Sequence, residues 1–211
     1  RSTKRYDNIY GEGRWKSSNI LSLAIGQAEI SLTPLQLSNF MAAVANRGHY
    51  YDPHVVRAIN DGGQVNTLEY QKHYLDIDTS YFSLVIDAME DVLLKGTAIR
   101  YGPRFREYDI CGKTGTAQNP HGEDHSVFVC FAPKHNPKIA IGAVVENAGQ
   151  GAHWAGPISF LAIEKYLNGK ISEQTKYIEE IMLEGDFIHE EEDVLTASDS
   201  VQVRADTSLN N

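Results

Sequence analysis

Two uninterrupted apolar runs near the middle of the sequence restrict its fold more than any other feature. Residues 127–132 read Val-Phe-Val-Cys-Phe-Ala, and Ile139–Val145 contains one glycine among apolar side chains. Strands that are apolar throughout, rather than at every second position, are usually covered on both faces. Residues 133–138 have the length and the turn-forming residues of a hairpin connection. The sequence therefore predicts two antiparallel strands inside a layered structure, with Ile110–Ala117 as a third strand.

Helical patterns precede these strands. Thr33 and Pro34 suit the cap and the first position of a helix, and residues 46–48, Asn-Arg-Gly, suit its end. A second helix is expected from Thr79 to Lys95, because apolar residues recur there at helical spacing. Residues 1–20 are polar and lack this spacing, so we expect irregular structure there.

Further helices follow the strands. One is expected from Pro157 to Leu167 and a short one near Thr175–Leu183, whereas residues 100–108 are expected to form a loop. Helices, then an antiparallel sheet, then a helix predict an α+β fold with the sheet layered between helices. We expect residues 1–170 to form one structural unit. Residues 171–211 are expected to form an acidic extension that is partly helical and then mobile.

The composition argues against several classes of protein. With 28 acidic and 19 basic residues the net charge is −9, so a uniform basic face is not expected, and neither is a nucleic-acid partner. No apolar run reaches the roughly 18 residues of a spanning helix, and the polar start lacks the character of a signal peptide. Cys111 and Cys130 are expected to be free, buried thiols, with a cross-strand disulfide as the alternative. No His/Cys group has zinc-ligand spacing, so neither a metal nor a cofactor is expected.

Residues 112–118, Gly-Lys-Thr-Gly-Thr-Ala-Gln, indicate a ligand-binding strand. They lie on the first predicted strand, beside a buried one. Glycine within a strand often marks the close approach of a ligand to the backbone. Lys113 supplies positive charge, and the hydroxyls of Thr114 and Thr116 supply short donors, so the group suits a carboxylate ligand.

Gly-Lys-Thr also occurs in phosphate-binding loops, and that alternative can be tested against the flanking residues. Such a loop needs a glycine five positions before the Gly-Lys pair and a helix directly after it. This sequence has Glu107 at the first place. After the strand, residues 119–122 read Asn-Pro-His-Gly, which breaks a helix. The phosphate-loop interpretation is therefore not favoured.

Residues 113–117, Lys-Thr-Gly-Thr-Ala, resemble the third active-site motif of the penicillin-binding protein and serine β-lactamase superfamily. Further segments, in the same order along the chain, resemble class B penicillin-binding proteins. Within them, Val127 and Cys130 differ from the residues of the family pattern. These segments are Ile25-Gly26-Gln27, Leu32-Thr33-Pro34-Leu35-Gln36-Leu37, Met89 through Gly96-Thr97-Ala98, His125 through Pro133, and Val145-Glu146-Asn147. The resemblance covers residues 19–169 and is nearest to the elongation type, penicillin-binding protein 2.

The resemblance implies the penicillin-binding protein and β-lactamase fold and the function of a peptidoglycan D,D-transpeptidase. In that family a serine attacks the D-Ala-D-Ala end of a stem peptide, and β-lactams acylate the same serine. By resemblance, Lys113 places positive charge near the serine and the ligand carboxylate. Thr114 and Thr116 hydrogen-bond that carboxylate, and the Thr116 backbone N–H is one of two oxyanion donors. Gly115 lets the ligand lie against the strand.

The family's nucleophile lies in a Ser-x-x-Lys motif, which no serine of this sequence matches. Ser17-Ser18-Asn19 has the Ser-x-Asn pattern of the second motif, but it lies only a few residues before Ile25, so a capping turn is the better interpretation. We therefore expect residues 1–170 to form the C-terminal part of a transpeptidase domain. Without the N-terminal half of that domain, the chain is expected to be inactive. Ile139–Val145 is then expected to be an open edge that pairs with that half or with another copy, or that the chain's own tail covers.

The resemblance also implies a location and partners. The full-length protein is expected at the periplasmic face of the bacterial inner membrane, anchored by an N-terminal helix that this sequence does not contain. Its expected ligands are the D-Ala-D-Ala end of a stem peptide and β-lactams. A β-lactam sensor domain remains an alternative, as does a D,D-carboxypeptidase or β-lactamase of the same superfamily. The segments around residues 25–37 and 131–133 favour the transpeptidase by resemblance.

Overall fold

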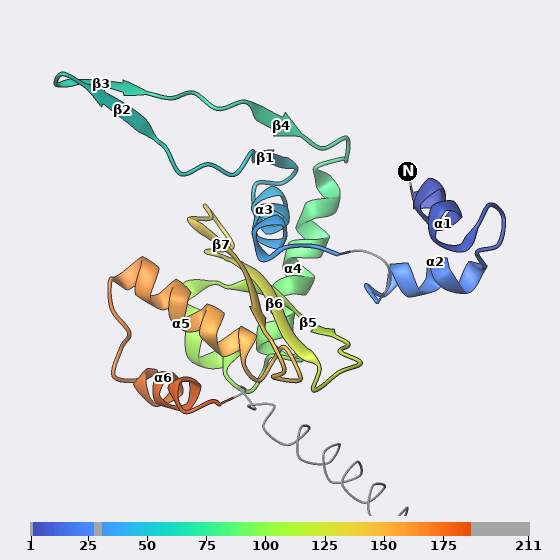
Figure 1. Ribbon diagram of the computed structural model, residues 1–211. Coiled ribbons are helices and arrows are strands. Elements are labelled where there is room, and N and C mark those ends of the chain that lie inside the picture. Colours follow the sequence, from blue (N-terminus) through green and yellow to red (C-terminus); the bar gives the residue numbers. More distant parts are fainter. Residues whose placement is uncertain (1, 28–30, 187–211) are drawn as a thin grey trace, which may run out of the picture.

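The centre of the molecule is a three-stranded antiparallel sheet with the strand order β5-β6-β7 (Figure 1). The computed structural model describes residues 2–27 and 31–186. The strands are β5 (Cys111–Ala117), β6 (His125–Ala132) and β7 (Ile139–Val145). All three predicted strands are confirmed, and β6 begins two residues earlier than its apolar run.

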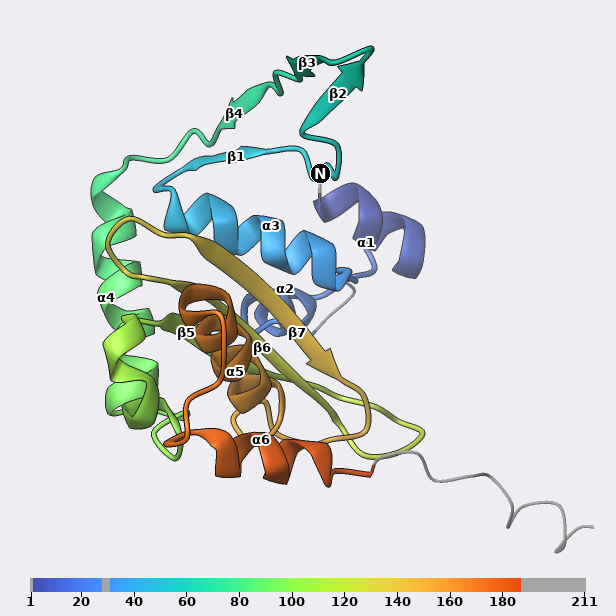
Figure 2. The same ribbon diagram turned by 90° about the vertical axis from the view of Figure 1, so that its left-hand side faces the viewer.

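Helices cover both faces of this sheet. On one face, α3 (Pro34–Ala45) packs on β6 and β7, and α4 (Ser80–Leu94) packs on β5. On the other face, α5 (Ala155–Asn168) packs on β6 and β7 (Figures 1 and 2). The fold is therefore α+β, with an antiparallel sheet between two helical layers, as the sequence predicts.

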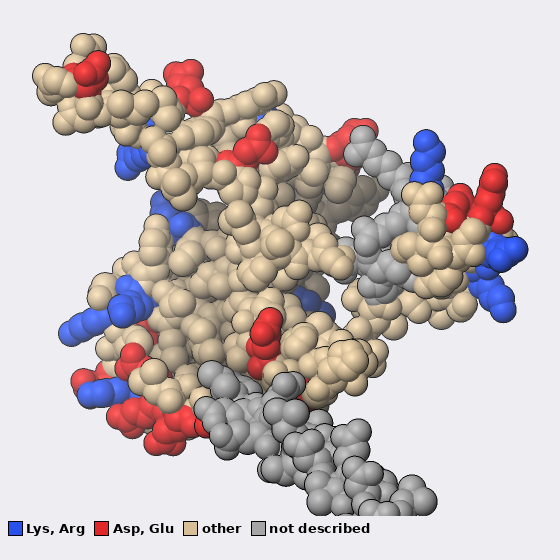
Figure 3. Space-filling model, viewed as in Figure 1, with Lys and Arg blue, Asp and Glu red and all other residues tan. Residues whose placement is uncertain are grey.

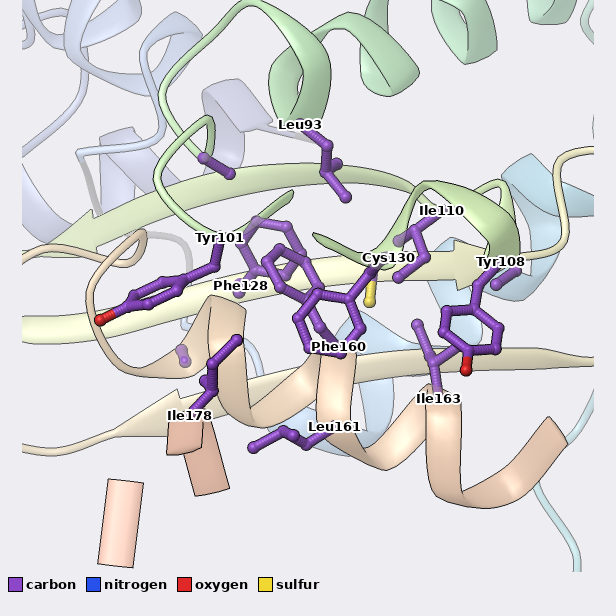
Figure 4. Packing of buried hydrophobic residues seen from close by; sticks show 14 residues of the cluster. Leu93, Tyr101, Tyr108, Ile110, Phe128, Cys130, Phe160, Leu161, Ile163 and Ile178 are labelled. Atoms are coloured by element: carbon purple, nitrogen blue, oxygen red, sulfur yellow. The ribbon is translucent and has the colours of Figure 1, made fainter. Parts of the chain in front are cut away.

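Alternate residues of β6 enter two different cores. Phe128 and Cys130 are fully buried on the side of α5, where the Phe128 ring meets the Phe160 ring edge-on at 5.2 Å (Figure 4). Phe131 is fully buried in a second core together with Met41 of α3 and residues of α4. Because side chains alternate between the two faces of a strand, covering both faces requires the continuous apolar run seen in the sequence.

The predicted helix boundaries follow local capping chemistry. The Gln36 backbone N–H donates to the Thr33 hydroxyl at 3.2 Å, and the Thr33 N–H donates to Gln36 Oε1 at 2.9 Å. This reciprocal pair is a capping box, which fixes the start of α3. The short helix expected near residue 175 is α6 (Lys176–Leu183), which packs against α5. The part of the extension expected to be mobile lies outside the described residues.

Two expectations of irregular structure were wrong. Residues 1–20 contain α1 (Ser2–Tyr10) and the start of α2 (Ser17–Ala24). The Tyr6 ring packs against the rings of Tyr10 and Trp15, with centroids 6.0 Å apart in both pairs, so α1 is held by aromatic contacts rather than by a regular apolar stripe. Residues expected to form a loop instead form a 3-10 helix, η1 (Gly102–Tyr108).

An extended arm leaves the body between α3 and α4 (Figures 1 and 2). It contains two separate two-stranded antiparallel sheets, one formed by β1 (His49–Tyr51) with β4 (Lys72–Tyr74), the other by β2 (Ala58–Asp61) with β3 (Gln64–Thr67). Acidic and basic side chains are interspersed over the face shown in Figure 3. Within residues 2–27 and 31–186, no helix has the length and apolar character needed to span a membrane.

Candidate functional site

The predicted ligand-binding residues lie on a strand with one open edge. β5 pairs with β6 along its whole length, from Cys111 opposite Phe131 to Ala117 opposite His125. No second strand of the described chain pairs with β5, so its other edge is open. An open strand edge presents backbone N–H and C=O groups that an extended peptide can use. Lys113, Thr114, Gly115 and Thr116 are therefore placed together at such an edge.

Lys113 provides the positive charge of this edge. Its side chain is exposed, and its ammonium donates to the carbonyl oxygen of Thr114 at 2.9 Å and to the Thr114 hydroxyl at 3.5 Å. It forms no ion pair with any acidic side chain in the described part of the chain. The charge is thus available to an anionic ligand, for which an ammonium is a suitable partner.

Thr97 adds a hydroxyl that the sequence analysis did not assign to the site. Its Oγ1 atom lies 2.8 Å from Oγ1 of Thr114, although the two residues belong to different elements. Thr97 follows α4, where the Ala98 N–H donates back to the Val92 carbonyl at 3.0 Å and turns the chain toward β5. Two hydroxyls and one ammonium therefore gather at one place, a donor set that suits a carboxylate. In the sequence, Gly96-Thr97-Ala98 is marked only by its resemblance to class B penicillin-binding proteins.

Close packing beside Gly115 requires a glycine at position 151. A Cβ atom built at Gly151 would collide with the carbonyl oxygens of Val127 and Gly115. The backbone at Gly151 therefore lies directly against β5 and β6. Ser126 fixes the same segment, because its buried hydroxyl donates to the Gln150 carbonyl at 3.0 Å and accepts from the Ala155 N–H at 3.1 Å.

Thr116 marks the far end of the edge. Its carbonyl oxygen accepts a hydrogen bond of 2.6 Å from the side-chain amide of Gln27, which lies 89 positions earlier in the sequence. An open hollow of about 590 Å³ adjoins this contact. It is lined by Gln27, Gln118, Asn119, Pro120 and Asp124.

The loop after β5 is ordered by Asn119. Its backbone N–H donates to the Asp124 carboxylate at 3.1 Å, and its side-chain amide donates to Oδ1 of Asn147 at 2.9 Å. The Asn147 N–H in turn donates to Nδ1 of His125 at 3.1 Å. His125 is the first residue of β6, as expected for a polar residue at the entry of a strand.

Other polar candidates serve the fold. Lys134 contacts the carboxylates of Asp87 at 2.7 Å and Glu90 at 2.8 Å, and these contacts raise the pKa of its ammonium. Cys111 and Cys130 are free and buried in cores on opposite faces of the sheet. Burial raises the pKa of the Cys111 thiol to about 12 and also raises the pKa of Cys130, so neither thiol is activated as a nucleophile.

The Ser-x-Asn match is a helix start. Residues 17–19 begin α2, and the Asn19 side chain accepts a hydrogen bond of 2.8 Å from the Lys16 N–H, in the manner of a capping residue. No group of three or more potential metal ligands occurs among residues 2–27 and 31–186.

Comparison with known proteins shows which family this chain resembles. Residues 6–162 match the model of the penicillin binding protein transpeptidase domain. The chain is 30% identical over 200 residues to the peptidoglycan D,D-transpeptidase MrdA of Haemophilus influenzae, covering 85% of this chain and 30% of the relative. It is 31% identical over 156 residues to MrdA of Escherichia coli K12, covering 65% of this chain and 24% of that relative.

Solved structures agree with this result. Pseudomonas aeruginosa PBP2 in complex with WCK 5153 superposes with a TM-score of 0.67 at 30% identity, over 82% of this chain and 38% of that one. Penicillin-binding protein A of Mycobacterium tuberculosis, as an imipenem acyl-enzyme complex, superposes with a TM-score of 0.61 at 27% identity. The superposition covers 68% of this chain and 33% of that one. The chain thus spans less than a third of the curated relatives cited above. By its sequence and its fold, it belongs to the penicillin binding protein transpeptidase domain family.

Proposed function

We propose that this chain is the ligand-holding part of a peptidoglycan D,D-transpeptidase whose nucleophilic serine lies on polypeptide outside these 211 residues. The observation that carries the proposal is the open edge of β5, where the Lys113 ammonium contacts the Thr114 hydroxyl and that hydroxyl contacts the hydroxyl of Thr97. Under this proposal, residues 1–170 are the C-terminal part of the catalytic domain and residues 171–211 are an extension.

The edge of β5 suits the end of a stem peptide. The D-Ala-D-Ala end is an extended peptide with a terminal carboxylate. The carboxylate would contact Lys113 and the threonine hydroxyls, and the peptide backbone would add to β5 as a further strand. The Thr116 N–H would donate to the oxygen of the attacked carbonyl, where negative charge develops in the transition state.

The chemistry divides between the two parts of the proposed enzyme. The serine oxygen attacks the penultimate D-alanine carbonyl, an ester forms, and the terminal D-alanine leaves with a proton. An amine of a neighbouring peptide then attacks the ester and releases the serine. A β-lactam would acylate the same serine by ring opening. Since no serine of this chain stands in Ser-x-x-Lys, the chain alone is expected to be inactive.

Location and partners follow from the same proposal. The curated relatives are named for an activity on peptidoglycan. We propose that the longer protein works at the periplasmic face of the inner membrane, held there by a helix outside this chain. The remainder of the catalytic domain is then the first partner of the described part.

The role of Lys113 can be tested in the longer protein. Lys113→Ala removes the cation of the edge, so the second-order rate constant for acylation by penicillin should fall by about 10²-fold or more, the range found when one preorganised donor is removed. Competition with a fluorescent penicillin measures this constant. Lys170→Ala is the control, because Lys170 is exposed and lies beyond the end of α5. Equal acylation of Lys113→Ala and the wild type would contradict the proposed role of this edge.

A further inference from the structure

The outward-facing carbonyls of β5 are held by side chains of this chain. Thr114 and Thr116 are two residues apart on one strand, so their carbonyl oxygens point to the same edge. The Thr114 oxygen accepts from Lys113 Nζ at 2.9 Å, and the Thr116 oxygen accepts from Gln27 Nε2 at 2.6 Å. Both are acceptors that an added strand would use.

The placement of Gln27 is built into the end of α2. Gly26 has φ +79°, a left-handed conformation that glycine adopts readily. The Gln27 N–H donates to the Ser22 carbonyl at 3.0 Å, five residues back. These two features are the signature of a Schellman motif, which ends the helix and sets the direction of the next residue. The half-buried Gln27 side chain therefore reaches Thr116 from a fixed turn.

We propose that Gln27 is a specificity-determining residue. Its side-chain amide occupies the position at the Thr116 carbonyl that the backbone N–H of an extended acyl-donor peptide would take. A side-chain carboxamide N–H and a peptide N–H are the same kind of donor. A peptide that adds to β5 must direct an N–H at this oxygen, so it must displace Gln27. This inference rests on the proposed function, because it concerns the ligand of that same edge.

The inference separates two kinds of β-lactam. A penicillin with an acylamino side chain has an amide N–H that can donate a hydrogen bond to the Thr116 carbonyl oxygen. A carbapenem such as imipenem has a hydroxyethyl group in place of that side chain and no amide N–H there. Competition with Gln27 should therefore slow acylation by the penicillin and not by the carbapenem. One ordinary hydrogen bond corresponds to a factor of up to about ten in a binding constant.

The experiment measures acylation of the longer protein by penicillin G and by imipenem. Gln27→Ala removes the competing donor, so acylation by penicillin G should become about three- to tenfold faster, while acylation by imipenem changes less than about twofold. Gln27→Met keeps the length of the side chain without adding a charge but removes the donor, and should act in the same direction. Thermal unfolding of both variants reports whether the fold is kept.

A matched control comes from the arm. Gln64 of β3 is exposed and lies outside the hollow, so Gln64→Ala removes a glutamine side chain without freeing the Thr116 oxygen, and the ratio of the two acylation rates should stay that of the wild type. Equal changes for both β-lactams, a slower reaction with penicillin G, or no change in either Gln27 variant would overturn the role of Gln27. If neither β-lactam acylates the wild-type protein, the proposed function itself fails.

Discussion

At the residue scale, the chain separates groups available to a ligand from groups committed to the fold. Lys113 is exposed and has no acidic partner among the described residues, whereas Lys134 is half-buried and paired with two carboxylates. The two thiols are buried and protonated. The two lysines differ in their surroundings. A lysine stabilises the fold where acidic side chains of the same chain pair with it, and it is available to a ligand where none does.

The buried thiols predict a loss of stability at alkaline pH. Burial raises the pKa of Cys111 from 9.0 to about 12, so the unfolded chain releases this proton first as the pH rises. The stabilisation is complete below pH 9.0 and is lost between 9.0 and about 12. Within this window the free energy of unfolding should fall by about 1.4 kcal/mol per pH unit for each thiol.

Urea unfolding at several pH values measures this slope. The double variant Cys111→Ala, Cys130→Ala should be less stable throughout, because two small cavities remain. Its slope should nevertheless be flatter than that of the wild type by the contribution of both thiols. An unchanged slope in the double variant would show that neither thiol carries the effect.

At the element scale, a buried carboxylate joins three elements. Glu164 of α5 is fully buried and accepts hydrogen bonds from the Tyr108 hydroxyl of η1 at 3.2 Å, the Ser172 N–H at 3.2 Å and the Thr175 hydroxyl at 2.6 Å. Burial and the charge of Glu164 raise the pKa of Tyr108. Thr175 directly precedes α6, and the Ser172 carbonyl accepts from the Lys176 N–H at 3.0 Å, so Glu164 fixes the start of that helix.

Replacing this carboxylate tests its role. In Glu164→Gln, one acceptor oxygen becomes a donor and at least one of the three hydrogen-bond donors loses its partner. The free energy of unfolding should fall by about 1–3 kcal/mol, and amides of α6 should exchange faster with solvent. Glu180→Gln makes the same change at an exposed position of α6 and serves as the control. Equal stability of the two variants would contradict the anchoring role of Glu164.

The sequence predicts elements better than it predicts contacts between them. Continuous apolar runs, a threonine cap and helical spacing are local signals, and they correctly predicted β5, β6, β7, α3 and α4. The aromatic packing of α1, the approach of Thr97 to Thr114, and the reach of Gln27 to Thr116 join residues without a shared local pattern. Only a three-dimensional arrangement brings such pairs together, so sequence patterns alone could not predict them.

At the scale of the whole molecule, the sheet has a second open edge. β7 pairs with β6 only, and in the described chain no strand lies on its other side. The Gly142 N–H points to that side, where it donates to the Ser38 hydroxyl of α3 at 3.0 Å. Val144 is two residues further along, so its N–H faces the same side. We propose that this edge pairs with the remainder of the catalytic domain in the longer protein and with a second copy when the chain is isolated.

Self-association of the isolated chain is therefore expected. Sedimentation at increasing concentration should show a dimer, and amides of β7 should be protected from exchange in that dimer. Val144→Pro removes an outward N–H without removing a bond to β6, so it should weaken the dimer, whereas Val144→Thr should not. A monomer at all concentrations, with residues 139–145 fully open to hydrogen exchange, would contradict the proposal.

The most direct test of the central claim is covalent labelling with a fluorescent penicillin. The claim is that this chain holds the ligand and that the attacking serine lies elsewhere. The purified 211-residue chain should remain unlabelled by gel and by intact mass, whereas the longer protein should take up one penicillin per molecule. Stoichiometric labelling of a serine within the 211-residue chain would contradict the claim.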